Sequence, residues 1–231
     1  DGREMALKRG PLVSTEARML RAMALSGAPV PEVLHQVDDL LCLEWLAERP
    51  ASSAAWAALG EGLARLHSQT GSSFGWPEHY AFGPHPIDNA AAASWPAFWA
   101  DQRLAPFVPH LHIELANRVE RLCATLPDRL PATPPAALLH GDLWTGNALF
   151  GARHAWLIDP ACYHGHAEVD LAMLDLFGTP PRDFWQGYGE PEPDRLERRP
   201  LYQLFPALVH LRLFGSGYRG MVTSLLDAAG A

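Results

Sequence analysis

The 231-residue chain is predicted to be an α+β protein, in which a small antiparallel sheet precedes a larger, mainly helical part. Residues 3–9 alternate between polar and apolar side chains, as a strand does. Residues 32–46 contain two short apolar runs on either side of Asp38 and Asp39, which indicates a hairpin. Residues 52–231 contain several stretches with apolar side chains at helical spacing. Strands first and helices afterwards are typical of the α+β class.

The composition excludes several classes of protein. Apolar residues make up 48% and charged residues 19%, the balance of a folded globular chain. A net charge of -8 argues against nonspecific nucleic-acid binding, and no apolar run reaches the ~18–20 residues of a membrane span. The cysteines Cys42, Cys123 and Cys162 lie far apart, so neither a disulfide scaffold nor a zinc ribbon is predicted. No signal peptide opens the chain, and a cytoplasmic location is expected.

Lys8 is the only lysine beside 17 arginines. It could be incidental, or it could serve a site that needs a compact ammonium group rather than a planar guanidinium. We expect its strand to be half-buried, with Met5 and Leu7 on one face, and Ser14 or Thr15 to cap the following helix.

That helix places Glu16 in its first turn. A strand lysine followed by a helix glutamate resembles the pair that holds nucleotide phosphates in kinases. By itself the pair of Lys8 and Glu16 is a weak signal.

The middle of the chain is predicted to connect the sheet to the helices. The second strand of the hairpin ends at Glu44, Trp45 and Leu46, and a helix is expected from Ser52 or Ser53 to Gly71. This arrangement is similar to a kinase linker, whose main chain would hold an adenine ring.

Three further segments complete this region. Residues 74–89 are rich in Gly, Pro, His and aromatic residues and are expected to form a long binding loop. Helices around residues 95–104 and 113–126 carry Trp, Phe and Leu at core spacing, and residues 127–135 form a proline-rich connector.

The most informative segment runs from residue 137 to residue 160. A short buried strand at residues 137–140 is followed by His140-Gly141-Asp142, and Asn147 comes five residues after the aspartate. Two short strands then form a hairpin that ends at Asp159. In kinases this spacing joins an aspartate that accepts a hydroxyl proton to an asparagine that binds magnesium, and a carboxylate at the strand end can bridge metal and phosphates.

Other interpretations of these motifs were weighed. Asp and Asn after a strand are common turn residues, but turn chemistry does not predict all three groups at these separations. His164, His166, Glu168 and Asp170 could form a metal cluster, yet a helical pattern starts among them and breaks the strand geometry it needs. No G-x-S-x-G turn is present, which excludes a serine hydrolase.

The strings HGDLWTGN, LIDPACYHGHAEVDLAMLDLFG and LYQLFPALVHLRLFGSGY resemble the fructosamine kinase (ketosamine-3-kinase) family. The resemblance spans about residues 3–225 and is densest at residues 138–178. The family belongs to the aminoglycoside- and choline-kinase-like branch of the protein-kinase-like fold. It therefore implies two lobes: an N-terminal lobe at residues 1–46, and a helical lobe at residues 47–231 with the catalytic hairpin at 137–160.

The resemblance also implies a role for each matching residue. Asp142 would be the catalytic base, and Asn147 and Asp159 would bind Mg²⁺. Lys8, fixed by Glu16, would hold the ATP phosphates.

Further roles concern positions around that centre. The main chain of Glu44, Trp45 and Leu46 would hold adenine. Trp144 would stack on the sugar or amine of the substrate. His140 and Asp170 would support the catalytic loop.

The implied reaction is transfer of a phosphoryl group from ATP to the 3-hydroxyl of a ketosamine, a fructosamine or ribulosamine, in the deglycation of amines or proteins. The partners would be ATP, Mg²⁺ and a glycated amine, with no nucleic acid or membrane, and the oligomeric state is left open. The alternatives are a kinase of an aminoglycoside, choline or a thiosugar, and a pseudokinase. The family's Gly-rich hairpin is expected upstream of Asp1, and His164 and Ala167 depart from the family's usual tyrosine and arginine.

Overall fold

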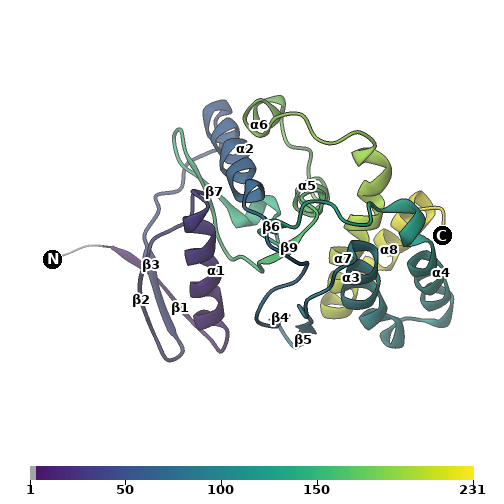
Figure 1. The fold of residues 1–231 in the computed structure, drawn as a ribbon. Coiled ribbons are helices and arrows are strands. Elements are labelled where there is room, and N and C mark those ends of the chain that lie inside the picture. Colours follow the sequence, from purple (N-terminus) through teal and green to yellow (C-terminus); the bar gives the residue numbers. More distant parts are fainter. Residues whose placement is uncertain (1–3) are drawn as a thin grey trace. The chain divides into compact units, whose positions relative to one another are not determined.

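A computed structural model describes residues 4–231, in which short antiparallel strands alternate with helices (Figure 1). The chain forms two units, each built from three segments. The first unit contains Asp1–Thr70, Ala137–Cys162 and Leu174–Glu190, and the second contains Gly71–Ala136, Tyr163–Met173 and Pro191–Ala231. The lobe boundary predicted between residues 46 and 47 stays a prediction, and Arg3, where the resemblance begins, lies outside the described residues.

The first unit begins with a three-stranded antiparallel sheet in the order β1-β3-β2, on which helix α1 packs (Figure 1). Val13, Ala17 and Leu20 of α1 bury their side chains against Leu41 and Leu43 of β3, because apolar residues recur at helical spacing in α1. The elements of this unit are β1 (Met5–Arg9), α1 (Val13–Leu25), β2 (Val33–Val37), β3 (Leu40–Glu44), α2 (Ser53–Ser68), β6 (Ala137–Leu139), a 3-10 turn (Thr145–Asn147), β7 (Ala148–Phe150), β8 (Ala155–Leu157) and α6 (Arg182–Tyr188).

Helix α2 begins at a predicted cap, since the Ser52 side chain accepts a hydrogen bond from the Ala55 amide at 3.2 Å. Its glycine Gly60 faces Gly187 of α6, and a Cβ on either one would collide with the main chain of the other helix. The two glycines therefore allow α2 and α6 to cross at close range.

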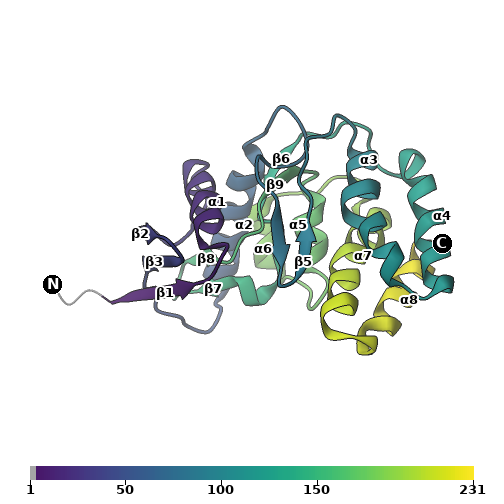
Figure 2. The same cartoon turned by 90° about the horizontal axis from the view of Figure 1, so that it is seen from below.

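The second unit is mainly helical (Figure 2). Aromatic side chains pack against one another inside it. Trp95 and Trp99 are fully buried, and the Trp95 indole donates to the Tyr202 hydroxyl at 3.0 Å. The elements are β4 (Tyr80–Phe82), β5 (His85–Ile87), α3 (Trp95–Trp99), a π-helical turn (Ala100–Leu104), a 3-10 segment (Ala105–His110), α4 (Ile113–Arg129), β9 (Tyr163–Gly165), α5 (Glu168–Leu174), α7 (Arg195–Phe214), a 3-10 turn (Ser216–Tyr218) and α8 (Arg219–Ala228).

Strand β1 alternates in burial as predicted, with Met5 and Leu7 on one face. That face is the exposed one, because Ala6 on the other face packs against the core of α1 and β3. The predicted cap of the following helix was wrong. Helix α1 begins at Val13 after an uncapped Leu12, so Ser14 and Thr15 lie inside its first turn.

Three further predictions, which concern the helical regions, were also wrong in part. Helix α2 ends at Ser68 rather than at Gly71, and the predicted loop at 74–89 contains the β4–β5 hairpin. Helix α4 continues through Pro127 to Arg129, so the connector begins later than predicted. Among residues 4–231, no helix combines the length and the apolar composition that a bilayer crossing requires.

Candidate active site

The loop after β6 carries His140, Gly141 and Asp142 and is held from inside the first unit. His140 is fully buried, and its Nδ1 accepts a hydrogen bond from the Asp142 amide at 3.3 Å. The proton therefore sits on Nε2, which donates to the carbonyl of Ile158 at 2.9 Å. Gly141 has φ 80°, which a residue with a side chain rarely adopts, so it lets the chain reverse directly before Asp142.

Asn147 orients the Asp142 carboxylate. Its amide nitrogen donates to Asp142 Oδ2 at 3.0 Å and to the Asp142 carbonyl at 2.8 Å, and Asn147 is buried. The short 3-10 turn of residues 145–147 makes this possible, because it brings two residues five positions apart into contact. The amide nitrogen is therefore used within the loop, and the amide oxygen Oδ1 is the atom left for another ligand.

Asp159 lies at the end of the β7–β8 hairpin. The strands pair Ala148 with Leu157, and the Ile158 amide donates to the Asn147 carbonyl at 3.0 Å, so the ends that carry Asn147 and Asp159 are neighbours. Asp159 has φ 55° and precedes Pro160, a strained backbone of the kind that clusters at functional sites. A carboxylate and an amide oxygen are hard donors that suit Mg²⁺, so the residues at this place fit that cation.

Lys8 joins the strand sheet to this hairpin. Its Nζ lies 2.7 Å from Glu16 Oε1 and 2.7 Å from Asp159 Oδ1, although Lys8 and Asp159 are 151 positions apart. The Glu16 side chain is 6% exposed, whereas that of Asp159 is 51% exposed. The ammonium group is therefore fixed from the buried side by Glu16 and shares its charge with a carboxylate that solvent and ligands can reach.

Electrostatics keep this cation charged. Burial alone lowers the pKa of Lys8, but hydrogen bonds and charge from Asp159 and Glu16 outweigh burial, so the pKa is raised above its ordinary value of 10.5. Burial raises the pKa of Glu16 above 4.5, and Lys8 only partly offsets this effect. The lysine is consequently a permanent positive charge at neutral pH.

Trp144 lies two residues after Asp142 and is 40% exposed. A Cβ on Gly146 would collide with its indole ring, so the ring packs directly against the glycine backbone. Phe177 meets the ring at a centroid distance of 6.2 Å and an angle of 71°, and it is 42% exposed. No sequence spacing indicated Phe177, although it lies in the same densely matching string, at the end of LDLF.

The predicted adenine-binding strand end is half-buried at Glu44 and Leu46 and exposed at Trp45. The Glu44 amide donates to the Glu32 carbonyl at 2.9 Å, so this donor is used within the sheet. The main chain of Trp45 and Leu46 continues as an irregular segment. Any adenine contact would therefore use the Glu44 carbonyl and the main chain of Trp45 and Leu46.

Asp170 is fully buried in the first turn of α5, in the second unit. Its charge helps to raise the pKa of Tyr163 to about 12, after the larger effect of burial. Its support of the catalytic loop stays a prediction.

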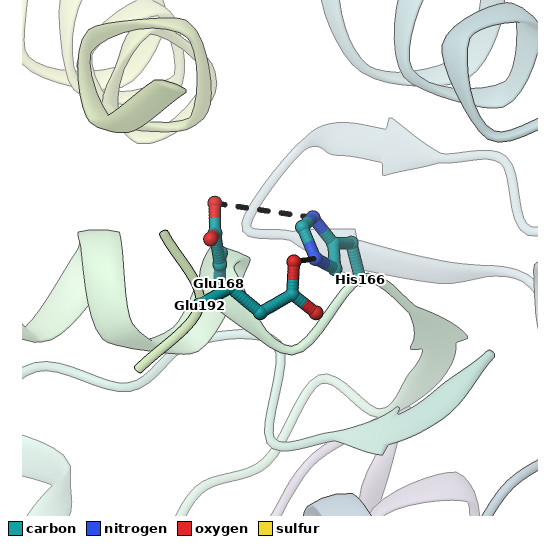
Figure 3. Close-up of side chains that lie close together, drawn as sticks. All are labelled: His166, Glu168 and Glu192. Atoms are coloured by element: carbon teal, nitrogen blue, oxygen red, sulfur yellow. Dashed lines mark ion pairs between the residues drawn. The ribbon is translucent and has the colours of Figure 1, made fainter. Parts of the chain in front are cut away.

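The residues considered above as a metal cluster do not form one group in the structure. The His164 ring bonds to the Ala136 carbonyl, whereas His166 and Glu168 meet Glu192, which sequence spacing did not indicate. Figure 3 shows each nitrogen of the His166 ring facing a carboxylate. Nδ1 lies 4.0 Å from Glu168, and Nε2 lies 3.4 Å from Glu192.

A cation already occupies this cluster. Arg198 donates to both oxygens of Glu168, at 2.5 and 2.8 Å, and lies 3.6 Å from Glu192. His166 Nδ1 lies 2.7 Å from the Tyr202 hydroxyl. The Glu168 oxygens that a metal would need are held by the guanidinium fork, so this cluster is a structural ion-pair network.

The chain is similar to known kinases over most of its length. The family model for fructosamine kinase matches residues 9–229. A probable ketoamine kinase of Thermus thermophilus is 36% identical, over 94% of this chain and 82% of that protein. A probable ketoamine kinase of Synechocystis is 39% identical, over 93% of this chain and 77% of that protein.

Solved structures show the same fold. A Thermobifida fusca protein with the provisional name fructosamine-3-kinase superposes with a TM-score of 0.93 at 37% identity, covering 99% of this chain and 86% of that one. A choline/ethanolamine kinase family protein of Mesorhizobium loti superposes with a TM-score of 0.64 at 18% identity, covering 99% and 82%, and shows the fold alone.

The fold and the site define a phosphotransferase of the protein-kinase-like class, which acts on a hydroxyl group. Within that class, the chain belongs to the fructosamine kinase family. The predicted family, α+β fold class and type of enzyme are confirmed.

Proposed function

We propose that this kinase transfers the γ-phosphoryl group of ATP to the 3-hydroxyl of a ketosamine, a fructosamine or ribulosamine, and so acts in deglycation. The observation that carries the proposal is the meeting of Lys8, Asp142, Asn147 and Asp159 at one end of the β7–β8 hairpin. These groups supply a cation for phosphates, a carboxylate for a hydroxyl proton and hard oxygen ligands for a metal.

Asp142 would accept the proton of the attacking hydroxyl. Its orientation is set before the substrate arrives, by Asn147 on the side chain and by His140 on the backbone. Lys8 would hold the ATP phosphates while Glu16 keeps its ammonium in place. Such positioning and charge neutralisation are the main sources of catalysis in phosphoryl transfer.

Asn147 Oδ1 and the Asp159 carboxylate would hold Mg²⁺. When bound, the metal supplies positive charge that neutralises the β- and γ-phosphates. Lys8 pairs with Asp159 in this structure, and phosphates would offer the ammonium a second anionic partner on the exposed side.

Trp144 and Phe177 would receive the sugar-amine. Two partly exposed aromatic rings meet edge to face, beside the proposed base, and offer a rigid apolar surface. The amine of a ketosamine is protonated at neutral pH, and an aromatic face attracts such a cation. We expect substrates with this amine to bind better than the corresponding neutral sugars.

ADP release with MgATP tests the proposal. Ribulosyl-lysine, fructosyl-lysine, kanamycin and choline are compared, with Asp142→Asn as the blank and Asp128→Asn, an exposed carboxylate on α4, as the matched control. We expect turnover with the ketosamines alone, and a loss of about 10²–10⁴-fold in Asp142→Asn with ATP affinity kept.

The other outcomes separate the alternatives. Turnover only with kanamycin or choline would support the proposed site residues but show that the substrate is not a ketosamine. ATP binding without turnover on any acceptor would favour a pseudokinase, and wild-type rates in Asp142→Asn would exclude Asp142 as the base.

A further inference from the structure

The second unit contains a cavity that the proposed reaction does not use. Its volume is about 260 Å³, and it lies where the 3-10 segment of residues 105–110 and the start of α4 meet the end of α7 and the start of α8. Figure 2 shows α4, α7 and α8 packed beside one another in this unit. Pockets for drug-sized ligands occupy roughly 300–1,000 Å³, so this cavity suits a small molecule.

One wall of the cavity is apolar. Phe107, Leu115 and Leu208 form its closed floor, at 1%, 4% and 0% exposure, and Leu111 and Leu211 are the half-buried apolar side chains that a ligand can reach. The floor is held by the 3-10 segment, α4 and α7 rather than by a flexible loop. A hydrocarbon or aromatic group placed there would leave water at little rearrangement cost.

The rim of the cavity is basic. His110, Arg212 and Arg219 contribute to the lining, whereas no aspartate or glutamate does. Arg212 forms no ion pair with any of residues 4–231, and Arg219 has only a 4.0 Å contact with the exposed Glu114. In a chain with a net charge of -8, a basic lining of this kind reverses the average sign of the surface.

A fourth basic group lies close by. His85 stacks on Phe107 at a centroid distance of 4.4 Å, and its Nε2 is buried without a hydrogen-bond partner. Burial lowers the pKa of His85, and the positive charges of Arg212 and then His110 lower it further. The positive charges of Arg212 and His110 therefore act on the same small region. A bound anion would reduce the electrostatic repulsion there.

We propose that this cavity binds a small amphiphilic anion, with its apolar part against Leu111 and Leu211 above the buried floor and its carboxylate or phosphate at Arg212 and Arg219. Apolar burial supplies affinity, and charge-assisted hydrogen bonds from the guanidinium groups supply selectivity for the head group. The cavity, one apolar wall and two arginines without a strong internal partner carry the inference, which does not depend on the identity of the sugar substrate.

Titration calorimetry on the full chain tests it with octanoate and octyl phosphate, which separate the two head groups, and with octanol and octylamine as neutral and cationic controls. We expect saturable binding of at least one of the anions, and none of octanol or octylamine at the same concentration. Arg212→Gln combined with Arg219→Gln should weaken anion binding at least tenfold.

Two further variants keep the test interpretable. Arg121→Gln removes the same charge from an exposed position on α4 outside the cavity, and it should bind the anion like wild type. Leu211→Trp should block the apolar part while both arginines remain. Equal binding of octanol, unchanged binding in the double variant, or no anion binding to the folded wild type would overturn the proposal.

Discussion

Two clusters, each of one cation and two carboxylates, lie in different units and differ in design. In the first unit, Lys8 sits between Glu16 and Asp159, and in the second, Arg198 sits between Glu168 and Glu192. Each is a cation between one buried and one half-exposed carboxylate.

The difference lies in the cation. Lys8 is a point charge on a flexible stem, and it reaches Asp159 through a single oxygen contact, which a phosphate or metal can replace. Arg198 engages both oxygens of Glu168 and also donates to the Pro193 carbonyl, so its donors are committed to the protein. Clusters of one cation and two carboxylates can therefore differ in how firmly the protein engages the cation.

The largest expected effect is on activity, in Lys8→Arg. The planar fork cannot reproduce a point charge held between Glu16 and Asp159, so kcat/KM for ATP should fall by roughly 10²–10³-fold while stability changes little. Steady-state kinetics check this, and Arg9→Lys, on the same strand and 73% exposed, is the matched control. Near-normal activity of Lys8→Arg would show that the first cluster works equally well with an arginine, as the second cluster has.

The next effect is on stability, in Arg198→Met. Removal of the fork leaves the Glu168 carboxylate buried and unpaired, which should lower the free energy of unfolding by about 3 kcal/mol. Urea denaturation measures the change, and kcat of the folded fraction should stay at the wild-type value. A loss of kcat without a loss of stability would show that the second cluster is not merely structural.

A smaller effect is expected at the aromatic pair, in Trp144→Ala. Loss of the exposed ring beside Phe177 should raise KM for the sugar-amine up to about tenfold and leave KM for ATP unchanged. Trp45→Ala, also exposed but at the strand end of the sheet, serves as the control and should leave KM for the sugar-amine unchanged. Equal changes in both KM values of Trp144→Ala would contradict a substrate contact.

The smallest effects are on the pH dependence of stability. The first cluster should lose stability at high pH, and the second should lose it at low pH. The pKa of Lys8 is raised, so its stabilising effect is complete below 10.5 and is lost as pH rises through the higher folded value. The pKa of His166 is lowered, chiefly by burial, so the folded state loses stability relative to the unfolded state as pH falls below 6.5.

Urea denaturation from pH 5 to pH 11.5 measures both. Between pH 7 and pH 11.5, the stability difference between wild type and Lys8→Met should shrink only above pH 10.5. The difference between wild type and His166→Gln should shrink only on the acid side. If both stability differences changed with pH in the same way, the pKa directions given for Lys8 and His166 would be contradicted.

Much of the catalytic hairpin could be predicted because its contacts are local. Asp142, Asn147 and Asp159 lie within eighteen positions, and strand pairing and a 3-10 turn bring them together through the hydrogen bonds of the hairpin itself. The core face of α1 follows from local pattern for the same reason, since Met19, Leu20 and Met23 recur at helical spacing and are all buried.

The errors arose where packing outweighs local pattern. The alternation of β1 is regular, but which face is covered depends on α1 and β3, and it is the face of Ala6 and Lys8. Glu192 and Phe177 follow no period that links them to His166 and Trp144, so no spacing rule could have found those contacts.

By itself, the sequence determined the chemical groups, their order and the local geometry of the hairpin, because hydrogen bonds between near neighbours depend on few residues. Only the tertiary structure decided that Lys8 meets Asp159, that Arg198 closes the second cluster, and that two arginines border an apolar cavity. Contacts between distant segments depend on how whole faces bury their apolar surface, and that burial is settled by the fold as a whole.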